Sequence, residues 1–234
     1  MPKNKTPRFY FSLRSPYSWL AHQELTARHP ELVERLEWVP FYEPDESSAR
    51  QLAEAGGRFP YSEMSREKNR YVLQDVGRLT KARGIEVTWP VDRDPVWEVP
   101  HLAYLVAAAH GRGQDYIAAV YRARFGEGRN ICDPATVAEI GARLGLDPQS
   151  LAGASQRPEL RAEGVAMLLD VCKDGVFGVP FLVHGYTRFW GLDRLDAFVE
   201  HLRTQQPSAG SVPQPLAAVG LGRSADDGHA GGCG

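Results

Sequence analysis

The fold is decided by residues 11–21, which read FSLRSPYSWLA. An apolar run ends there in Ser15-Pro16-Tyr17-Ser18, and apolar residues then resume at helical spacing. Serine is a good N-cap and proline is tolerated in the first helical turn. The stretch therefore predicts a buried strand, a short turn and a helix that begins at Pro16 with Ser15 as its N-cap.

Strand patterns occur near both ends of the chain. Residues 8–13 and 37–42, RFYFSL and EWVPFY, are apolar and aromatic, and they flank the first helix. Later, VPFLVHG and TRFW are separated by Gly185 and Tyr186, which predicts a hairpin. An amphipathic helix, GLDRLDAFVEHLRTQ, follows it. The sequence thus predicts β-α-β at one end and β-β-α at the other.

The region between these ends is helical in pattern almost throughout. We expect about five helices between residues 44 and 170. The first begins at a capping box from Ser62 to Ser65, with Glu63 and Glu67 in its first turn, and ends on Gly84. Further helices are indicated by an N-cap at Asp133 and by glycines at three predicted ends, Gly111, Gly126 and Gly145.

Composition excludes several classes of function. The chain has 234 residues, 43% hydrophobic and 24% charged, with a formal net charge of -2. Such a chain forms a globular core, and its scattered Lys and Arg residues offer no field for a nucleic acid. No apolar run approaches the roughly 20 residues that cross a bilayer, and the first residues, MPKNKTPRFYF, show no apolar h-region, so we expect no signal peptide. We expect a cytoplasmic protein with no membrane or nucleic-acid partner.

Cysteines and histidines offer no metal framework. Cys132, Cys172 and Cys233 have no CxxC spacing, and the histidines form neither HxH nor HExxH. Three cysteines cannot all pair with one another, which suits a reducing compartment. We therefore expect no metal and no disulfide framework.

Three segments in a fixed order identify a family resemblance. FYFSLRSPYSWLA, GVFGVPFLV and FWGLDRL resemble the 2-hydroxychromene-2-carboxylate isomerases and the kappa-class glutathione transferases, and REKNRYVLQDVGRLTKARGIEVTWP is a weaker fourth match. The resemblance covers roughly residues 8–204. It implies an α/β fold of the thioredoxin type with an inserted all-helical domain, as in DsbA. The expected parts are a discontinuous thioredoxin-like domain, a helical insertion and a disordered tail, at residues 7–43 plus 171–204, 44–170 and 205–234.

The resemblance assigns the central role to Ser15. In redox members of the fold two cysteines stand where this chain has Ser15 and Ser18, so dithiol chemistry is excluded. By analogy with the serine-bearing branch, the Ser15 hydroxyl donates a hydrogen bond to the sulfur of glutathione and keeps it ionised. A helix N-terminus favours such an anion by about 0.3 to 1 kcal/mol.

Other residues match positions that hold glutathione in the family. Pro180 matches a cis-proline, and Val179 before it would pair through its backbone with the thiol's cysteinyl unit. Asp193 matches the residue that holds the γ-glutamyl amino group, and Leu192 stands where some relatives have serine. Lys68 corresponds to a lysine pointed at the site. Three of these residues also have an ordinary structural explanation. Pro180 could be a trans proline that starts a strand, Asp193 a first-turn aspartate of a helix, and Lys68 a lysine on a solvated helix face.

Substrate contacts are expected from Arg14, Tyr17 and Trp19. Arg14 directly precedes Ser15 and would bring a positive charge to an anionic substrate or to the thiolate, although a surface arginine would give the same pattern. Aromatic side chains concentrate near the joint between sheet and helical insertion, where apolar pockets are common. They are Tyr17, Trp19, Phe59, Tyr61, Trp89, Trp97 and Trp190.

The resemblance implies a glutathione-dependent isomerase acting on a small aromatic or conjugated enone acid by reversible thiolate addition. Three alternatives stay open: a kappa-class-like transferase that conjugates an electrophile, a non-catalytic ligand-binding protein of the same fold, and an enzyme that uses another low-molecular-weight thiol. Relatives of this kind are often dimers, so a homodimer is expected, but no sequence feature identifies its interface.

Overall fold

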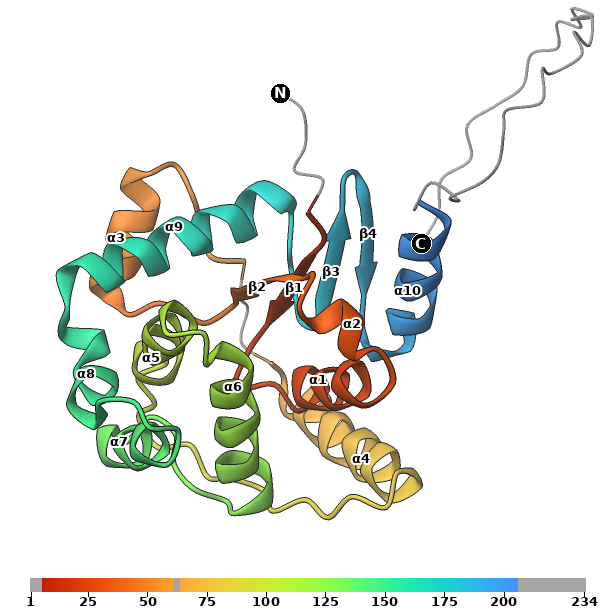
Figure 1. Cartoon of the computed structure of the whole chain (residues 1–234), viewed down its shortest axis with the longest axis horizontal. Helices are drawn as coiled ribbons and strands as arrows, with labels where there is room; N and C mark the ends of the chain where they lie inside the picture. Colours follow the sequence, from red (N-terminus) through yellow and green to blue (C-terminus); the bar gives the residue numbers. More distant parts are fainter. Residues whose placement is uncertain (1–5, 61–63, 206–234) are drawn as a thin grey trace, which may run out of the picture.

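Four strands form one mixed sheet in the computed structural model, which describes residues 6–60 and 64–205 (Figure 1). They are β1 (Arg8–Phe11), β2 (Glu37–Pro40), β3 (Phe181–His184) and β4 (Thr187–Trp190), in the order β2-β1-β3-β4. β1 pairs in parallel with β2 and antiparallel with β3, and β3 pairs antiparallel with β4. The strands and the hairpin that the sequence predicts are confirmed.

β1 lies inside the sheet and is buried on both faces. Successive strand residues point to opposite faces. Phe9 and Phe11 accordingly pack into the large core that contains α1 (Pro16–Arg28) and α10 (Leu195–Thr204), whereas Tyr10 packs on the other face. That second cluster includes Val171 of α9 (Pro158–Asp174). The aromatic run of β1 is therefore the centre of two packed layers.

The described helices between the two pairs of strands outnumber the five expected. They are α3 (Glu46–Glu54), α4 (Arg66–Ala82), α5 (Glu98–Ala109), α6 (Gly113–Tyr121), the π-helical turn η1 (Arg122–Gly126), α7 (Pro134–Arg143), α8 (Pro148–Ala152), the 3-10 turn η2 (Ala154–Gln156) and α9. The short helix α2 (Pro30–Val33) lies between β1 and β2. α3 was missed because only Ser48 and Leu52 of it are buried, and α8 because five residues show no period. None of the helices in the described ranges combines the length and hydropathy of a membrane span.

Most predicted helix ends are confirmed. Ser15 and Asp133 cap α1 and α7 with their side-chain oxygens, as predicted. Helix α4 begins later than the predicted capping box, because Ser65 is its N-cap and Arg66 its first residue. Gly84, like Gly111 and Gly145, has a positive φ just beyond a helix. The exception is Gly126, which ends the π-helical turn instead. Ser62, Glu63 and the predicted tail beyond residue 205 lie outside the described residues.

The boundaries of the two predicted domains stay a prediction. α9 runs unbroken from Pro158 to Asp174, across the predicted boundary at residue 171.

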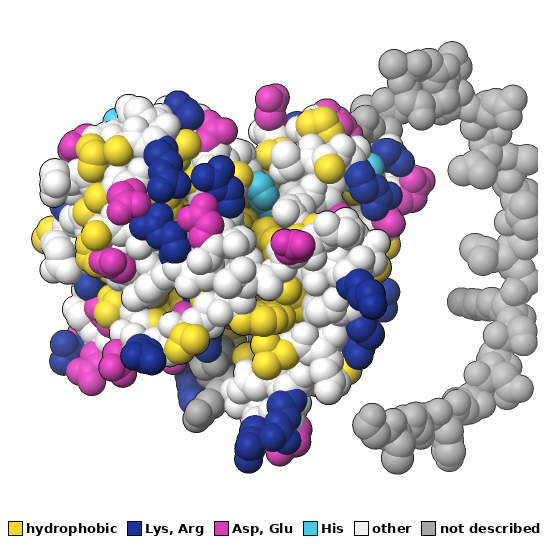
Figure 2. All heavy atoms as spheres, turned by 90° about the horizontal axis from the view of Figure 1, so that it is seen from below, with side chains coloured by type: hydrophobic (Ala, Val, Ile, Leu, Met, Phe, Trp, Pro, Cys, Tyr) yellow, Lys and Arg dark blue, Asp and Glu magenta, His cyan; other side chains and the backbone are white. Residues whose placement is uncertain are grey.

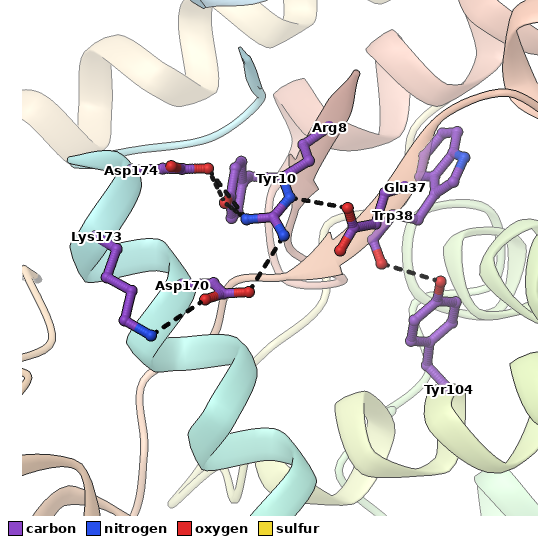
Figure 3. A network of polar contacts seen from close by, with 8 residues as sticks. All are labelled: Arg8, Tyr10, Glu37, Trp38, Tyr104, Asp170, Lys173 and Asp174. Carbon is purple, nitrogen blue, oxygen red and sulfur yellow. Dashed lines mark hydrogen bonds and ion pairs between the residues drawn. The ribbon is translucent and has the colours of Figure 1, made fainter. Parts of the chain in front are cut away.

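A cluster of charges fixes the end of α9 to the sheet (Figure 3). The Arg8 guanidinium of β1 pairs with Glu37 of β2 at 2.8 Å, with Asp174 at 3.2 Å and with Asp170 at 3.4 Å. The Tyr10 hydroxyl donates to the same Asp174 carboxylate at 2.7 Å. Because the chain leaves α9 at this point and turns into β3, the cluster positions residues 175–180, which form part of the candidate site.

Candidate active site

Ser15 lies at the N-terminus of α1, in the wall of a cleft. Its backbone is extended, and its hydroxyl oxygen accepts a hydrogen bond from the Ser18 N–H at 3.2 Å. A hydroxyl can accept and donate at the same time. The Ser15 O–H is therefore a donor that can face an anion in the cleft, beside the partial positive charge of the helix N-terminus.

Ser18 has a different place from Ser15. It is completely buried, and its hydroxyl oxygen accepts from the Ser12 N–H at 3.3 Å. Ser18 thus stabilises the turn from beneath, while Ser15 borders the cleft.

The turn between β1 and α1 is held by several further hydrogen bonds. The Ser12 carbonyl accepts from the Ser15 N–H at 3.1 Å and from the buried Tyr121 hydroxyl at 3.0 Å. The Ser12 hydroxyl accepts from the Arg14 N–H at 3.3 Å. Tyr121 belongs to α6, and the other groups belong to the turn itself, so contacts within the turn and from α6 fix the position of the Ser15 side chain.

His101 of α5 completes the support of this turn. Its Nε2 accepts from the Leu13 N–H at 3.0 Å, and its Nδ1 lies 2.7 Å from the Trp97 carbonyl oxygen, which can only accept. The ring is therefore neutral with the proton on Nδ1. Complete burial lowers the pKa of His101 to about 3, so the ring keeps this state at neutral pH. The same ring stacks on Tyr42, another residue of the cleft wall, with centroids 4.9 Å apart.

The cleft has a volume of about 280 Å³ and opens at the carboxyl ends of β1 and β2. Figure 2 views this end of the molecule, where hydrophobic side chains gather among charged ones. Aromatic and aliphatic groups form most of the wall, and Arg14, Lys68 and Glu43 are its charged members. The lining residues are Ser12, Arg14, Ser15, Pro16, Tyr17, Phe41, Tyr42, Glu43, Phe59, Pro60, Met64, Lys68, Val72, Trp97, Phe177, Gly178, Val179 and Trp190.

Arg14 lies in the cleft wall, and the substrate contact expected of it stays a prediction. Its guanidinium is 3.5 Å from a Glu43 carboxylate oxygen and 5.2 Å from the centre of the Trp97 ring, a cation–π distance. Trp97 is itself held by the buried Arg124 guanidinium, 5.3 Å from the ring centre, which in turn binds both oxygens of Asp92. The indole is thus a fixed platform for Arg14.

Tyr17 and Lys68 also lie in the wall. The Tyr17 hydroxyl donates to Asp75 of α4 at 2.8 Å. The pKa of Tyr17 is raised well above its usual value, mainly by burial and next by this hydrogen bond. Tyr17 therefore joins α1 to α4, and α4 carries Lys68 in its first turn beside the cleft.

The segment before β3 forms another wall. The Val179–Pro180 peptide bond is cis, as predicted, and Val179 borders the cleft. Pro180 is absent from the wall, and its carbonyl accepts from the Gly191 N–H at 3.0 Å. Phe177 and Trp190 stand at the wall more than half exposed, with ring centroids 4.8 Å apart.

Besides Pro180, three predicted site residues do not line the cleft. Trp19 is buried, and its ring stacks on that of Phe125 with centroids 4.8 Å apart. Residues 17 and 19 are about 200° apart around a helix, so Trp19 points away from the cleft that Tyr17 lines. Leu192 packs against the core, and the exposed Asp193 carboxylate pairs with Arg194 at 3.0 Å. The substrate contact expected of Trp19 is corrected. The contacts expected between a thiol and Leu192 or Asp193 stay predictions. Neither residue lines the cleft of the single chain.

The sequence analysis did not single out several cleft residues, and it predicted others only as members of an aromatic set. Of the predicted aromatic set, Phe59, Trp97 and Trp190 line the cleft, Trp89 does not, and Tyr61 lies outside the described residues. Glu43, Phe177 and the supporting His101 were not singled out. A signal for Phe177 existed in the segment GVFGVPFLV, but nothing in the sequence pairs Glu43 with Arg14 or His101 with Leu13.

The described cysteines stand apart from the cleft. Cys132 is not among its lining residues, and burial raises the pKa of its thiol to about 12. The Cys172 thiol donates to the Arg58 carbonyl oxygen at 3.2 Å. Among residues 6–60 and 64–205, no three His, Cys, Asp or Glu side chains are grouped as metal ligands.

Comparisons with known proteins agree on one family. The model of the DSBA-like thioredoxin domain matches residues 8–203. The 2-hydroxychromene-2-carboxylate isomerase of Sphingobium xenophagum is 28% identical over 203 residues, 85% of this chain and 98% of that protein. A solved structure of a 2-hydroxychromene-2-carboxylate isomerase superposes with a TM-score of 0.66 at 22% identity, covering 85% of this chain and 94% of the other. Cytosolic disulfide reductase DsbM from Pseudomonas aeruginosa, solved with GSH, gives 0.55 at 18% identity, with 85% and 98% covered. The family resemblance and the α/β, DsbA-like fold expected from the sequence are confirmed.

Proposed function

Because this chain belongs to the family of DSBA-like thioredoxin domains, we propose that it is a glutathione-dependent isomerase that acts on a small conjugated or aromatic enone acid. The observation that carries the proposal is the position of Ser15: a hydroxyl donor at a helix N-terminus, in the wall of a largely apolar cleft. The 28% identity with an isomerase over most of both chains supports the same class of reaction.

The residues of the cleft fit a thiol borrowed from solution. The Ser15 O–H and the positive end of α1 favour a sulfur anion over a neutral thiol. No cysteine is among the described residues of the cleft wall, and serines stand at residues 15 and 18, so no thiol of the described residues can serve there. In the solved structure of the related disulfide reductase the protein is accompanied by GSH, which is consistent with glutathione as the thiol.

When bound, glutathione would supply a sulfur nucleophile for reversible addition to the conjugated carbon, the chemistry that lets the former double bond rotate before elimination returns the thiol. Ser15 holds the sulfur as an anion through its O–H. Val179 offers backbone groups to the cysteinyl unit, in the manner of an added strand. Arg14 and Lys68 offer positive charge to carboxylates, and Arg14 stabilises the negative charge that forms on the substrate's carbonyl side.

The cleft wall favours a flat, conjugated substrate. Phe41, Phe59 and Trp97 present rings to it, whereas a sugar or phosphate would need many more polar donors than this wall provides. Arg14, fixed on the Trp97 ring, can hold the acid group of such a substrate.

A test follows the fate of the thiol. Purified protein is mixed with 2-hydroxychromene-2-carboxylate and a small amount of glutathione, and both isomers and free thiol are measured with time. We expect isomerisation that needs glutathione but does not consume it, and that falls at least about tenfold in Ser15→Ala, the loss of one charge-assisted hydrogen bond. Consumption of one thiol per substrate would instead establish conjugation, and binding without turnover would leave a ligand-binding protein.

A further inference from the structure

A second hollow adjoins the cleft. It has a volume of about 320 Å³ and shares three residues with the cleft, Arg14, Glu43 and Trp97. Its other lining residues are Pro44, Asp45, Pro95, Val96 and Glu98. The Arg14–Glu43 ion pair therefore lies at the boundary between the two spaces.

The geometry of the Arg14–Glu43 ion pair allows a ligand carboxylate to replace Glu43. The nearest nitrogen and oxygen atoms are 3.5 Å apart, longer than the roughly 2.7–2.9 Å of a charge-assisted hydrogen bond. The Arg14 and Glu43 side chains are 36% and 48% exposed, and ion pairs exposed to that extent add little stability. The Trp97 ring, 5.2 Å from the Arg14 guanidinium, is a contact of Arg14 that does not involve Glu43. A ligand carboxylate can thus take the place of Glu43 at small cost.

The other carboxylates near the boundary are already engaged. Asp45 binds the Arg161 guanidinium at 2.8 Å and caps α3 through the Ser48 N–H, also at 2.8 Å. Glu98 is buried, and its carboxylate accepts from the Asp45 N–H at 2.5 Å. Both face the second hollow, so that side of Arg14 repels an incoming anion, and the cleft side is the route by which a ligand carboxylate approaches.

We propose that Glu43 is a specificity-determining residue, which occupies Arg14 until the carboxylate of an acid substrate displaces it. The proposal rests on the proposed function, since it names how the acid group of that substrate is selected. Acids gain the Arg14 contact after displacing Glu43, whereas neutral analogues leave the pair intact. Glu43 therefore lowers the affinity for acids and leaves the affinity for neutral analogues unchanged.

The test uses two probes of the same shape, trans-cinnamate and the uncharged trans-cinnamamide, titrated calorimetrically without any thiol. In Glu43→Gln we expect trans-cinnamate to bind about three- to tenfold more tightly and trans-cinnamamide to bind unchanged. Glu46→Gln is the matched control, because Glu46 loses the same charge three residues away and lines neither space. It should alter the binding of neither probe.

A double variant assigns the effect to the pair. In Arg14→Leu we expect weaker trans-cinnamate binding, and in Arg14→Leu combined with Glu43→Gln no gain from the second change. The proposal is overturned if Glu43→Gln changes both probes equally, changes neither, or acts in the same way without Arg14, and also if the wild type prefers trans-cinnamamide. Because no thiol is present, these results are independent of whether Ser15 activates glutathione. Far-ultraviolet circular dichroism verifies that each variant is folded.

Discussion

The Leu13 backbone N–H donates to Nε2 of the buried His101 ring at 3.0 Å, which ties α5 to the turn that presents Ser15. Replacing His101 by Leu leaves that N–H buried without an acceptor, which costs about 1–3 kcal/mol of unfolding free energy. His101→Gln keeps an amide oxygen within reach of Nε2's position, so its loss should be clearly smaller. Urea unfolding at neutral pH measures the free energy of unfolding of both variants. Equal losses in His101→Leu and His101→Gln would contradict a stabilising role of the hydrogen bond between Leu13 and His101.

His22 of α1 predicts an acid dependence of stability. Burial lowers the pKa of His22 to about 4, below the value near 6.5 of an unfolded histidine. The unfolded chain therefore takes up the proton first. The free energy of unfolding should fall as the pH drops from about 6.5 toward 4, with a contribution from this residue on the order of 1.4 kcal/mol per pH unit.

The variant His22→Phe isolates that contribution. A phenyl ring keeps the aromatic contacts with Trp38 and Tyr121, whose ring centroids lie 5.6 and 5.7 Å from the His22 ring. Buried His101 contributes its own acid dependence equally in both proteins. Urea unfolding at about pH 7 and about pH 5 should show the variant gaining on the wild type at the lower pH. Parallel pH dependences would contradict the depressed pKa.

Two helical glycines should respond in opposite ways to alanine. Gly164 of α9 packs against the Tyr42 hydroxyl and Leu102, and a Cβ there would clash with both, so Gly164→Ala should lose about 1–3 kcal/mol of unfolding free energy. Gly77 of α4 has nothing within 4 Å of its Cβ position. Gly77→Ala should gain about 0.5–1 kcal/mol. Thermal unfolding midpoints compare the pair, and a loss at Gly77 or no loss at Gly164 would contradict the packing described.

The sequence predicts well whatever is fixed by neighbouring residues. Ser15 and Pro16 define the start of α1 by local capping chemistry, and Gly185 with Tyr186 defines the turn between β3 and β4. The cis bond before Pro180 is instead implied by the family resemblance of the segment GVFGVPFLV. The helix start and the hairpin turn need no knowledge of distant contacts, and the structure confirms them together with the cis bond.

Contacts between distant segments could not be predicted in the same way. The expected role of Trp19 fails because the direction of a side chain around α1 decides whether it meets the cleft or Phe125. The pairs Arg14–Glu43 and Leu13–His101 join residues 29 and 88 positions apart, and no local pattern marks them. Asp193 matches a family position, yet it lies outside the cleft wall of the single chain.

The central claim is that the Ser15 hydroxyl stabilises a thiolate borrowed from solution. The measurement is the absorbance of the glutathione thiolate against pH in the presence of wild type, Ser15→Ala and Ser15→Thr, where Thr keeps a hydroxyl at the N-cap. We predict a thiol pKa lowered by about one unit or more with the wild type, largely retained with Thr and lost with Ala. A thiol pKa that stays at its free value with the wild type, or that falls equally with Ser15→Ala, would contradict the claim.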